Sequence, residues 1–183
     1  MKSENEKYIG DQKKFAIRYL PIENNSDFAF CHLVFGGEII GNENETCYLS
    51  TWKNSLKTIK DKLENNPKSL FHEEFNNRSN RELFELIWKA NQEEEDYNTE
   101  FSYLPVLDNE IWSNCHISID ETTDAYLIAM TEDNGKIKFL WEGWTEPCPV
   151  DKIGKLFSVS IDKNFVIETI EKCLMEIENN TQK

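Results

Sequence analysis

The stretch AYLIAMTEDNGKIKFLW at residues 125–141 decides the fold class. Its second half alternates hydrophobic side chains with lysines, as in a strand with one buried face. Its first half is a second strand candidate, and Asn134-Gly135 lies between the two. An Asn-Gly pair flanked by alternating hydrophobic residues is a strong signal for a tight hairpin turn. Strands joined in this way are antiparallel, so the sequence predicts an antiparallel sheet.

The same kinds of signal continue on both sides of this hairpin. Further strands are predicted at 15–20, 28–35, 39–40, 115–119 and 157–161, with Gly36-Gly37 as a second hairpin turn. Helices are predicted to begin at Ser50 or Thr51, at Ser79 and at Asp162. Hairpins dominate and βαβ alternation is absent, which favours an α+β fold. We expect one domain, 1–183, with an antiparallel β-sheet, helices packed mainly on one face, and residues 1–8 disordered.

The helix predictions rest on caps and apolar stripes. Trp52, Leu56, Ile59 and Leu63 follow helical spacing, so they form one buried face. Ser79 with Glu82 forms a capping box at the start of the second helix. An acidic run that begins at Glu93 disfavours a helix C-terminus, so this helix is predicted to end near residue 91.

Charge is distributed very unevenly along the chain. The formal net charge is -14, and residues 73–135 carry 16 acidic but only 3 basic side chains. Such a protein is repelled by nucleic acids and by anionic membrane surfaces, because binding those requires clustered Lys and Arg. We therefore expect a basic protein partner, no nucleic acid and no membrane.

Cysteine usage and the N-terminus indicate a reducing compartment. The five cysteines lack CxxC spacing, and the first residues lack the apolar core of a secretory signal. No apolar run reaches the length of a membrane span. We expect a cytoplasmic protein with reduced thiols, either a monomer or a weak homodimer.

Motifs for catalysis or cofactor binding are absent from the sequence. It has no phosphate-binding glycine loop, no GxSxG and no HExxH. Cys31-His32 and Cys115-His116 are adjacent pairs in predicted strands, where neighbouring side chains point to opposite faces, so neither pair forms a zinc site or a catalytic dyad. We expect no cofactor, no metal and no catalytic residue. The best enzyme candidate is the cluster His72, Glu73 and Glu74.

Acidic side chains with a nearby tryptophan are the candidates for partner binding. Interfaces concentrate binding energy in aromatic anchors surrounded by polar residues. The predicted partner-binding residues are Glu93, Glu94, Glu95, Asp96, Asp120, Glu121, Asp124 and Trp144.

Four segments together resemble the immunity protein 42 family of bacterial polymorphic toxin systems. They are Ile9-Gly10-Asp11 running into Phe15-Ala16-Ile17, the hairpin from Val34 to Gly41, the helix from Trp52 to Leu63, and the Asn134-Gly135 hairpin leading to Trp141. The resemblance covers most of the chain in order. The stretch 65–105 is longer and more acidic than is typical of that family.

The resemblance implies a non-catalytic antitoxin that binds and neutralises a cognate toxin domain, as in contact-dependent inhibition. It implies no particular site residues. The acidic middle of the chain independently suits a basic toxin such as a nuclease. Two alternatives stay open: a hydrolase or metal-dependent enzyme using His72, Glu73 and Glu74, and a small-ligand-binding or scaffold protein.

Overall fold

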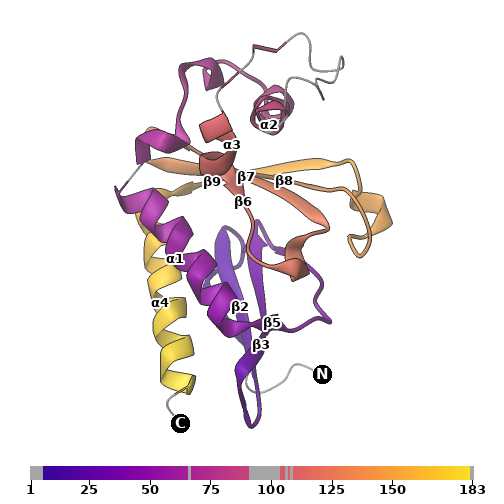
Figure 1. Ribbon diagram of the computed structural model, residues 1–183, viewed down its shortest axis with the longest axis vertical. Helices are drawn as coiled ribbons and strands as arrows, with labels where there is room; N and C mark the ends of the chain where they lie inside the picture. Colours follow the sequence, from indigo (N-terminus) through magenta and orange to yellow (C-terminus); the bar gives the residue numbers. More distant parts are fainter. Residues whose placement is uncertain (1–5, 66, 91–103, 106, 108, 182–183) are drawn as a thin grey trace.

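The strands form two antiparallel sheets in a computed structural model that describes residues 6–65, 67–90, 104–105, 107 and 109–181 (Figure 1). Sheet A contains β1 (Lys7–Asp11), β2 (Phe15–Ile22), β3 (Asn25–Phe35), β4 (Glu38–Ile40) and β5 (Cys47–Tyr48). Sheet B contains β6 (His116–Ile117), β7 (Tyr126–Asp133), β8 (Lys136–Gly143) and β9 (Leu156–Asp162). The predicted α+β class is confirmed, with two sheets where one was expected.

Four α-helices and several short 3₁₀ turns complete the described part of the chain. The helices are α1 (Leu49–Asn65), α2 (Asn80–Lys89), α3 (Asn109–Cys115) and α4 (Lys163–Thr181). The 3₁₀ turns are η1 (Pro67–Leu70), η2 (Glu73–Phe75), η5 (Glu121–Thr123) and η6 (Val150–Lys152). The helix α3 was not predicted. It replaces the start of the strand expected at 115–119, which is reduced to β6.

The hairpin predicted from residues 125–141 is present as β7 and β8. The register pairs Asp133 with Lys136, and the two turn residues Asn134 and Gly135 have positive φ angles of 51° and 76°. Those angles are the ones that a two-residue hairpin turn requires. The strand β9 then pairs antiparallel with β8, which makes β8 a central strand.

The N-terminal strand begins earlier than the sequence indicated. Lys7 and Tyr8, predicted to be disordered, instead lie in β1, where Lys7 pairs with Tyr19 and Tyr8 pairs with Arg18 of β2. Residues 1–5 lie outside the described residues. The polar composition of β1 hid it, because only one of its faces packs on the protein.

The main core lies between the inner faces of both sheets and the helices α1 and α4. Phe35 joins the two sheets, since its ring lies 4.6 Å from that of Phe139 and 5.2 Å from that of Trp141, between ring centroids. The predicted stripe of α1 is buried in this core, from Trp52 to Leu63. Burying large side chains of this kind contributes roughly 2 kcal/mol each, so this contact is a principal source of stability.

A second core lies on the opposite face of sheet B. There α2 and α3 pack against Ala129 of β7 and Leu140 of β8. Helices therefore cover both faces of sheet B, above and below it in Figure 1, whereas the helices that pack against sheet A are α1 and α4. The hairpin signals in the sequence fix which strands are neighbours, but they carry no information on which hairpins share a sheet.

Two of the three predicted helix caps are confirmed. The cap predicted at Ser50 or Thr51 is wrong, because α1 begins at Leu49 and both residues lie inside its first turn. Ser79 and Glu82 form the reciprocal capping box of α2, and the Asp162 carboxylate accepts hydrogen bonds from the backbone N–H groups of Asn164 and Phe165 at the start of α4. The caps at Ser79 and Asp162 depend only on contacts between residues close together in the chain, which is why the sequence was sufficient to locate these two.

Candidate functional site: an acidic surface with a tryptophan

The turn between β6 and β7 places acidic side chains on the surface. Its central residues Thr122 and Thr123 are buried, while Glu121 and Asp124 are exposed. Asp120 caps this turn, since its Oδ1 accepts hydrogen bonds from the Thr122 N–H at 3.1 Å and from the Thr122 hydroxyl at 2.6 Å. The hydrogen bonds between Asp120 and Thr122 therefore hold the turn, and the carboxylates of Glu121 and Asp124 are left exposed.

Asp120 differs from its two neighbours because it is partly buried. Burial raises the pKa of its carboxyl group, the hydrogen bonds from Thr122 oppose that rise, and the negative charges of Glu121 and Asp124 add to it. Its Oδ2 atom is buried and has no hydrogen-bond partner within the described residues. The geometry gives Asp120 a role in shaping the turn and leaves Glu121 and Asp124 as the charges that a partner can reach.

The loop that follows β4 lies directly against this turn. The Asn42 N–H donates to the Thr122 carbonyl at 2.9 Å. Gly41 has a φ of +114°, and a Cβ atom there would lie 2.9 Å from the same carbonyl oxygen, so the close approach requires glycine. This contact brings the exposed Glu43 and Glu45 beside the turn.

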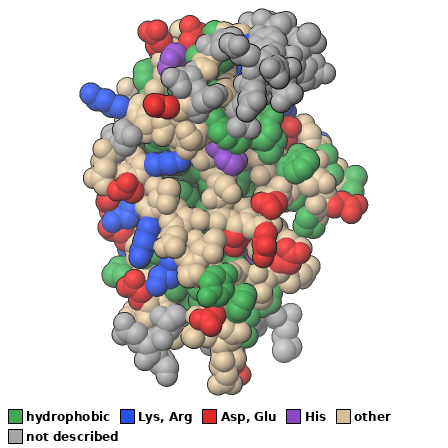
Figure 2. Space-filling model, viewed as in Figure 1, with side chains coloured by type: hydrophobic (Ala, Val, Ile, Leu, Met, Phe, Trp, Pro, Cys, Tyr) green, Lys and Arg blue, Asp and Glu red, His purple; other side chains and the backbone are tan. Residues whose placement is uncertain are grey.

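These four exposed carboxylates form what we call the acidic surface: Glu43, Glu45, Glu121 and Asp124. Figure 2 shows a group of Asp and Glu side chains over the turn between β6 and β7. Sequence analysis missed the two residues of the loop, because residues 1–72 carry equal numbers of acidic and basic side chains. The local sequence offered one signal, the glycine at position 41, where the loop approaches the Thr122 carbonyl closely.

Trp144 is held beside the acidic surface with half of its side chain exposed. Its backbone N–H donates to the Ala125 carbonyl at 3.0 Å, and its indole Nε1–H donates to the Asp124 carbonyl at 2.6 Å. The residue is nevertheless 55% exposed. A large ring fixed in place and open to solvent is suited to anchor a partner, because little conformational entropy remains to be lost on binding. The structure thus brings Trp144 and Asp124 together.

A row of polar contacts on the outer face of sheet A supports the loop. Arg18 Nε donates to Glu6 at 2.7 Å, and Arg18 Nη1 lies 3.1 Å from His32 Nδ1. His32 Nε2 lies 3.0 Å from the Asn42 carbonyl. Arginine can only donate, so Nδ1 of His32 accepts and Nε2 carries the proton that is donated to Asn42. Burial and the charge of Arg18 lower the pKa of His32, which keeps the ring neutral in this role.

The enzyme candidate His72, Glu73 and Glu74 does not form a convergent site. His72 Nδ1 accepts a hydrogen bond from the Glu74 N–H at 3.1 Å and so caps the 3₁₀ turn η2. The Glu74 carboxylate pairs with Arg78 at 2.9 Å, and Glu73 is exposed. The contacts of His72 and Glu74 hold the 3₁₀ turn and Arg78 in place, and the three side chains do not meet at a common point.

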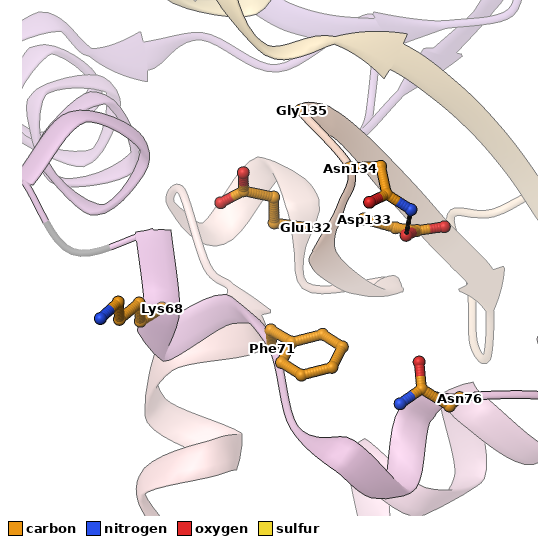
Figure 3. Close-up of a pocket in the computed structure, with 7 residues that line it drawn as sticks. All are labelled: Lys68, Phe71, Asn76, Glu132, Asp133, Asn134 and Gly135. Carbon is orange, nitrogen blue, oxygen red and sulfur yellow. Dashed lines mark hydrogen bonds between the residues drawn. The ribbon is translucent and has the colours of Figure 1, made fainter.

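A cavity of about 610 Å³ lies near this cluster, between residues 68–76 and the β7–β8 turn. It is lined by Lys68, Phe71, Asn76, Glu132, Asp133, Asn134 and Gly135. In Figure 3 the Phe71 ring projects between the two segments, while Asn134 donates to Asp133 across the turn at 2.6 Å. Glu132 pairs with Lys163 at 3.3 Å. His72, Glu73 and Glu74 do not line this cavity.

The cysteines are buried, and His116 is half-buried against a tryptophan. All five thiols are free and buried, and burial raises the pKa of Cys115 to about 12, which disfavours the reactive thiolate. The His116 ring stacks on Trp112 with 3.9 Å between centroids, and burial together with the nearby Lys62 charge lowers its pKa to about 4. Within the described part of the chain, no three His, Cys, Asp or Glu side chains are arranged to hold a metal ion.

Two further observations concern the predicted acidic run and membrane-spanning helices. The predicted partner-binding residues Glu93, Glu94, Glu95 and Asp96 lie outside the described residues. None of the helices in the described ranges combines the length and the apolar character needed to cross a bilayer.

Together, the two-sheet fold and an acidic surface beside a fixed, exposed tryptophan define a small α+β protein with a surface suited to binding another protein. The chain belongs to the immunity protein 42 family, whose model matches residues 5–176. This confirms the resemblance noted in the sequence.

Comparison with solved structures shows the same fold in a second protein. CdiI from Burkholderia dolosa AUO158 superposes with a TM-score of 0.62 at 16% sequence identity, over 93% of this chain and 99% of that chain. At this identity the likeness concerns the fold. The curated proteins searched include no match to the chain.

Proposed function

We propose that this chain is a non-catalytic immunity protein that binds a cognate bacterial toxin domain and neutralises it through the acidic surface. Membership of the immunity protein 42 family supports the class of function. The observation that supports the binding site is the placement of four exposed carboxylates beside the fixed ring of Trp144. We also propose that the protein and its toxin belong to a contact-dependent inhibition system.

The charge of the surface favours a basic toxin, with a nuclease as the leading case. A nuclease must hold phosphates, so its substrate groove carries Lys and Arg. An acidic surface competes for that groove directly, and opposite charges accelerate encounter at low salt. Trp144 then slows dissociation, because a desolvated aromatic anchor contributes mainly to the lifetime of a complex.

Inhibition by occlusion requires no cofactor and no chemistry from the inhibitor. We propose that the protein acts in the cytoplasm as a monomer or weak homodimer, where it covers the active site or substrate groove of the toxin. Its own groups serve only to recognise the partner and to hold the surface in shape, as the contacts of Asp120 and His32 do.

Affinity capture of the tagged protein from its native host tests the proposal. The capture is washed at low and at high salt, and the retained proteins are identified by mass spectrometry. We expect one stoichiometric partner, the basic C-terminal domain of a large secreted protein encoded beside this gene. Absence of that partner under both washes, with its expression verified in the same culture, would contradict the proposal.

A matched pair of variants tests the site. Glu121→Lys with Asp124→Lys reverses the exposed charges of the turn, and we expect the partner to be lost already at the low-salt wash, where the new repulsion is screened least. Glu168→Lys with Asp133→Lys reverses the same number of charges outside the acidic surface and serves as the control. Equal retention by the two double variants would place the binding site elsewhere.

A further inference from the structure

The outer face of sheet A carries hydrophobic side chains where a solvated face would be polar. Antiparallel sheets with one covered face normally alternate apolar and polar residues. At the end of sheet A remote from sheet B, both faces are apolar. Leu20 faces Phe30 across the β2–β3 pair, and Phe28 faces Tyr48 across the β3–β5 pair.

The two outermost rings form an exposed aromatic pair. Phe28 is 39% and Tyr48 is 48% exposed, and their rings meet edge to face with 5.3 Å between centroids. Leu20 and Phe30 are half-buried beside them. We call these four side chains the aromatic strip. Hydrophobic side chains reach the surface over the β3–β5 region in Figure 2, below the acidic group described above.

Acidic residues lie at both ends of the aromatic strip. Asp27 precedes Phe28 in β3, is exposed, and lines a cavity together with Tyr48 of the strip. At the other end, Glu45 lies in the loop that leads into β5. Glu43 lies close enough to Tyr8 and His32 on this face for its charge to add to the raised pKa of Tyr8, which is due first to burial, and to oppose the lowering of the pKa of His32. The loop 41–46 therefore connects the β6–β7 turn, which Asn42 contacts, with β5, which carries Tyr48.

We propose that the aromatic strip is the apolar centre of the toxin interface, with Asp27, Glu43 and Glu45 forming its charged rim. This rests on the proposed function and deepens it by naming the second contact region. The occupant is the toxin domain, presenting apolar side chains surrounded by Lys or Arg. An apolar centre with a complementary charged rim is how stable interfaces are organised.

The negative charge around the aromatic strip disfavours a second copy of this chain as the partner that covers it. A symmetric dimer through the strip would bring the acidic rims of two copies together, and each chain has a formal net charge of -14. Like charges facing each other across an interface oppose association. A basic toxin domain meets the same rim with favourable charge.

A cavity next to Tyr48 adds a concave region at the edge of the strip. It has a volume of about 230 Å³ and is lined by Ser26, Asp27, Tyr48, Leu49, Ser50 and Lys53. The Lys53 ammonium lies 3.9 Å from Glu178, so its charge is directed toward α4. An arginine or lysine of the toxin that enters this cavity lies beside Tyr48 and Asp27, which both line it.

Equilibrium binding of the captured toxin domain to matched variants tests the inference. Phe28→Ser with Tyr48→Ser removes the aromatic pair, while Phe71→Ser with Met175→Ser removes two equally exposed apolar side chains elsewhere. We expect the first pair to weaken binding by about 100-fold or more and the second by less than about threefold. Thermal unfolding and gel filtration verify that each variant is folded.

A charge variant provides an independent measure should the aromatic variant not fold. Asp27→Lys changes an exposed carboxylate, and we expect about tenfold weaker binding. Wild-type affinity for both Asp27→Lys and the aromatic variant would overturn the inference while leaving the proposed function intact. A wild-type dimer that the aromatic variant dissociates, with toxin binding unchanged, would also overturn it. Failure of the wild-type protein to bind the toxin domain would refute the proposed function itself.

Discussion

At the scale of single residues, Trp144 links the acidic turn to the end of β8. Two hydrogen bonds hold it against the turn, so its ring is available to a partner without further ordering. Trp144→Ala is expected to weaken toxin binding by about 2 kcal/mol, roughly 30-fold, mainly through faster dissociation. Surface plasmon resonance gives both rate constants.

Met175→Ala is the matched control for Trp144→Ala, because Met175 is also 55% exposed and lies on α4. It should leave both rate constants unchanged. A similar loss of affinity in the two variants would mean that Trp144 acts through general stability, and an unchanged affinity for Trp144→Ala would remove it from the interface.

His116 makes the stability of the fold depend on pH. Its pKa is lowered from 6.5 to about 4 in the folded protein, so between these values the unfolded chain binds a proton that the folded chain does not. Stability therefore decreases as pH falls through this range, by an amount on the order of 3 kcal/mol from this residue. Below about pH 4 the folded protein takes up the proton too, and the contribution no longer grows.

Replacing His116 by phenylalanine isolates this effect. His116→Phe retains a ring to stack on Trp112 but cannot be protonated. Denaturant unfolding of both proteins at several pH values should show a shallower loss of stability in His116→Phe between about pH 6.5 and pH 4. Parallel pH profiles for the two proteins would show that His116 does not stay neutral in the fold.

At the scale of structural elements, the acidic surface depends on the fit between the loop 41–46 and the turn after β6. A side chain at Gly41 would collide with the Thr122 carbonyl and would also be strained by the positive φ. Gly41→Ala should therefore displace Glu43 and Glu45, lower the free energy of unfolding by about 2 kcal/mol and reduce toxin affinity.

Gly36→Ala is a control that introduces backbone strain from a positive φ without a collision of the new Cβ atom. Gly36 also has a positive φ, +59°, but a Cβ atom there would meet nothing within 4 Å. Its substitution should cost about 1 kcal/mol of stability and leave toxin affinity unchanged. Equal binding by the Gly41 and Gly36 variants would show that the position of the loop does not matter for recognition.

The elements also show which features of the fold the sequence could reveal. The β7–β8 hairpin, the capping box at Ser79 and the stripe of α1 depend on residues near one another in the chain, and all were predicted correctly. The helix α3 was missed because it is short and its buried face is completed by α2 and sheet B. Such elements are stabilised by distant residues, so their local sequence is ambiguous.

At the scale of the whole molecule, the division into two sheets determines the candidate site. It brings the loop after β4 in sheet A against the turn that precedes β7 in sheet B. The sequence identified Asp124 and Trp144 as candidates but had no means of adding Glu43, Glu45 or the aromatic strip. Those residues belong to a charge-balanced segment, and only the tertiary contacts place them on a shared surface.

Net charge makes a prediction for the kinetics of binding. Association with a basic toxin domain should slow by about tenfold or more between roughly 0.05 and 0.5 M salt, while dissociation changes little, because salt screens the approach of exposed charges. Stopped-flow measurement of the intrinsic tryptophan fluorescence follows association. The Glu121→Lys, Asp124→Lys variant should show a weaker salt dependence, whereas an identical dependence would place the steering charge elsewhere.

Growth of a host that expresses the captured toxin domain tests the central claim, that this chain neutralises a toxin by binding it through the acidic surface and Trp144. Wild-type protein should restore growth. The variant with Glu121→Lys, Asp124→Lys and Trp144→Ala, produced at the same level, should not restore it. Continued toxicity in the presence of the wild-type protein, or equal protection by the variant, would contradict the account.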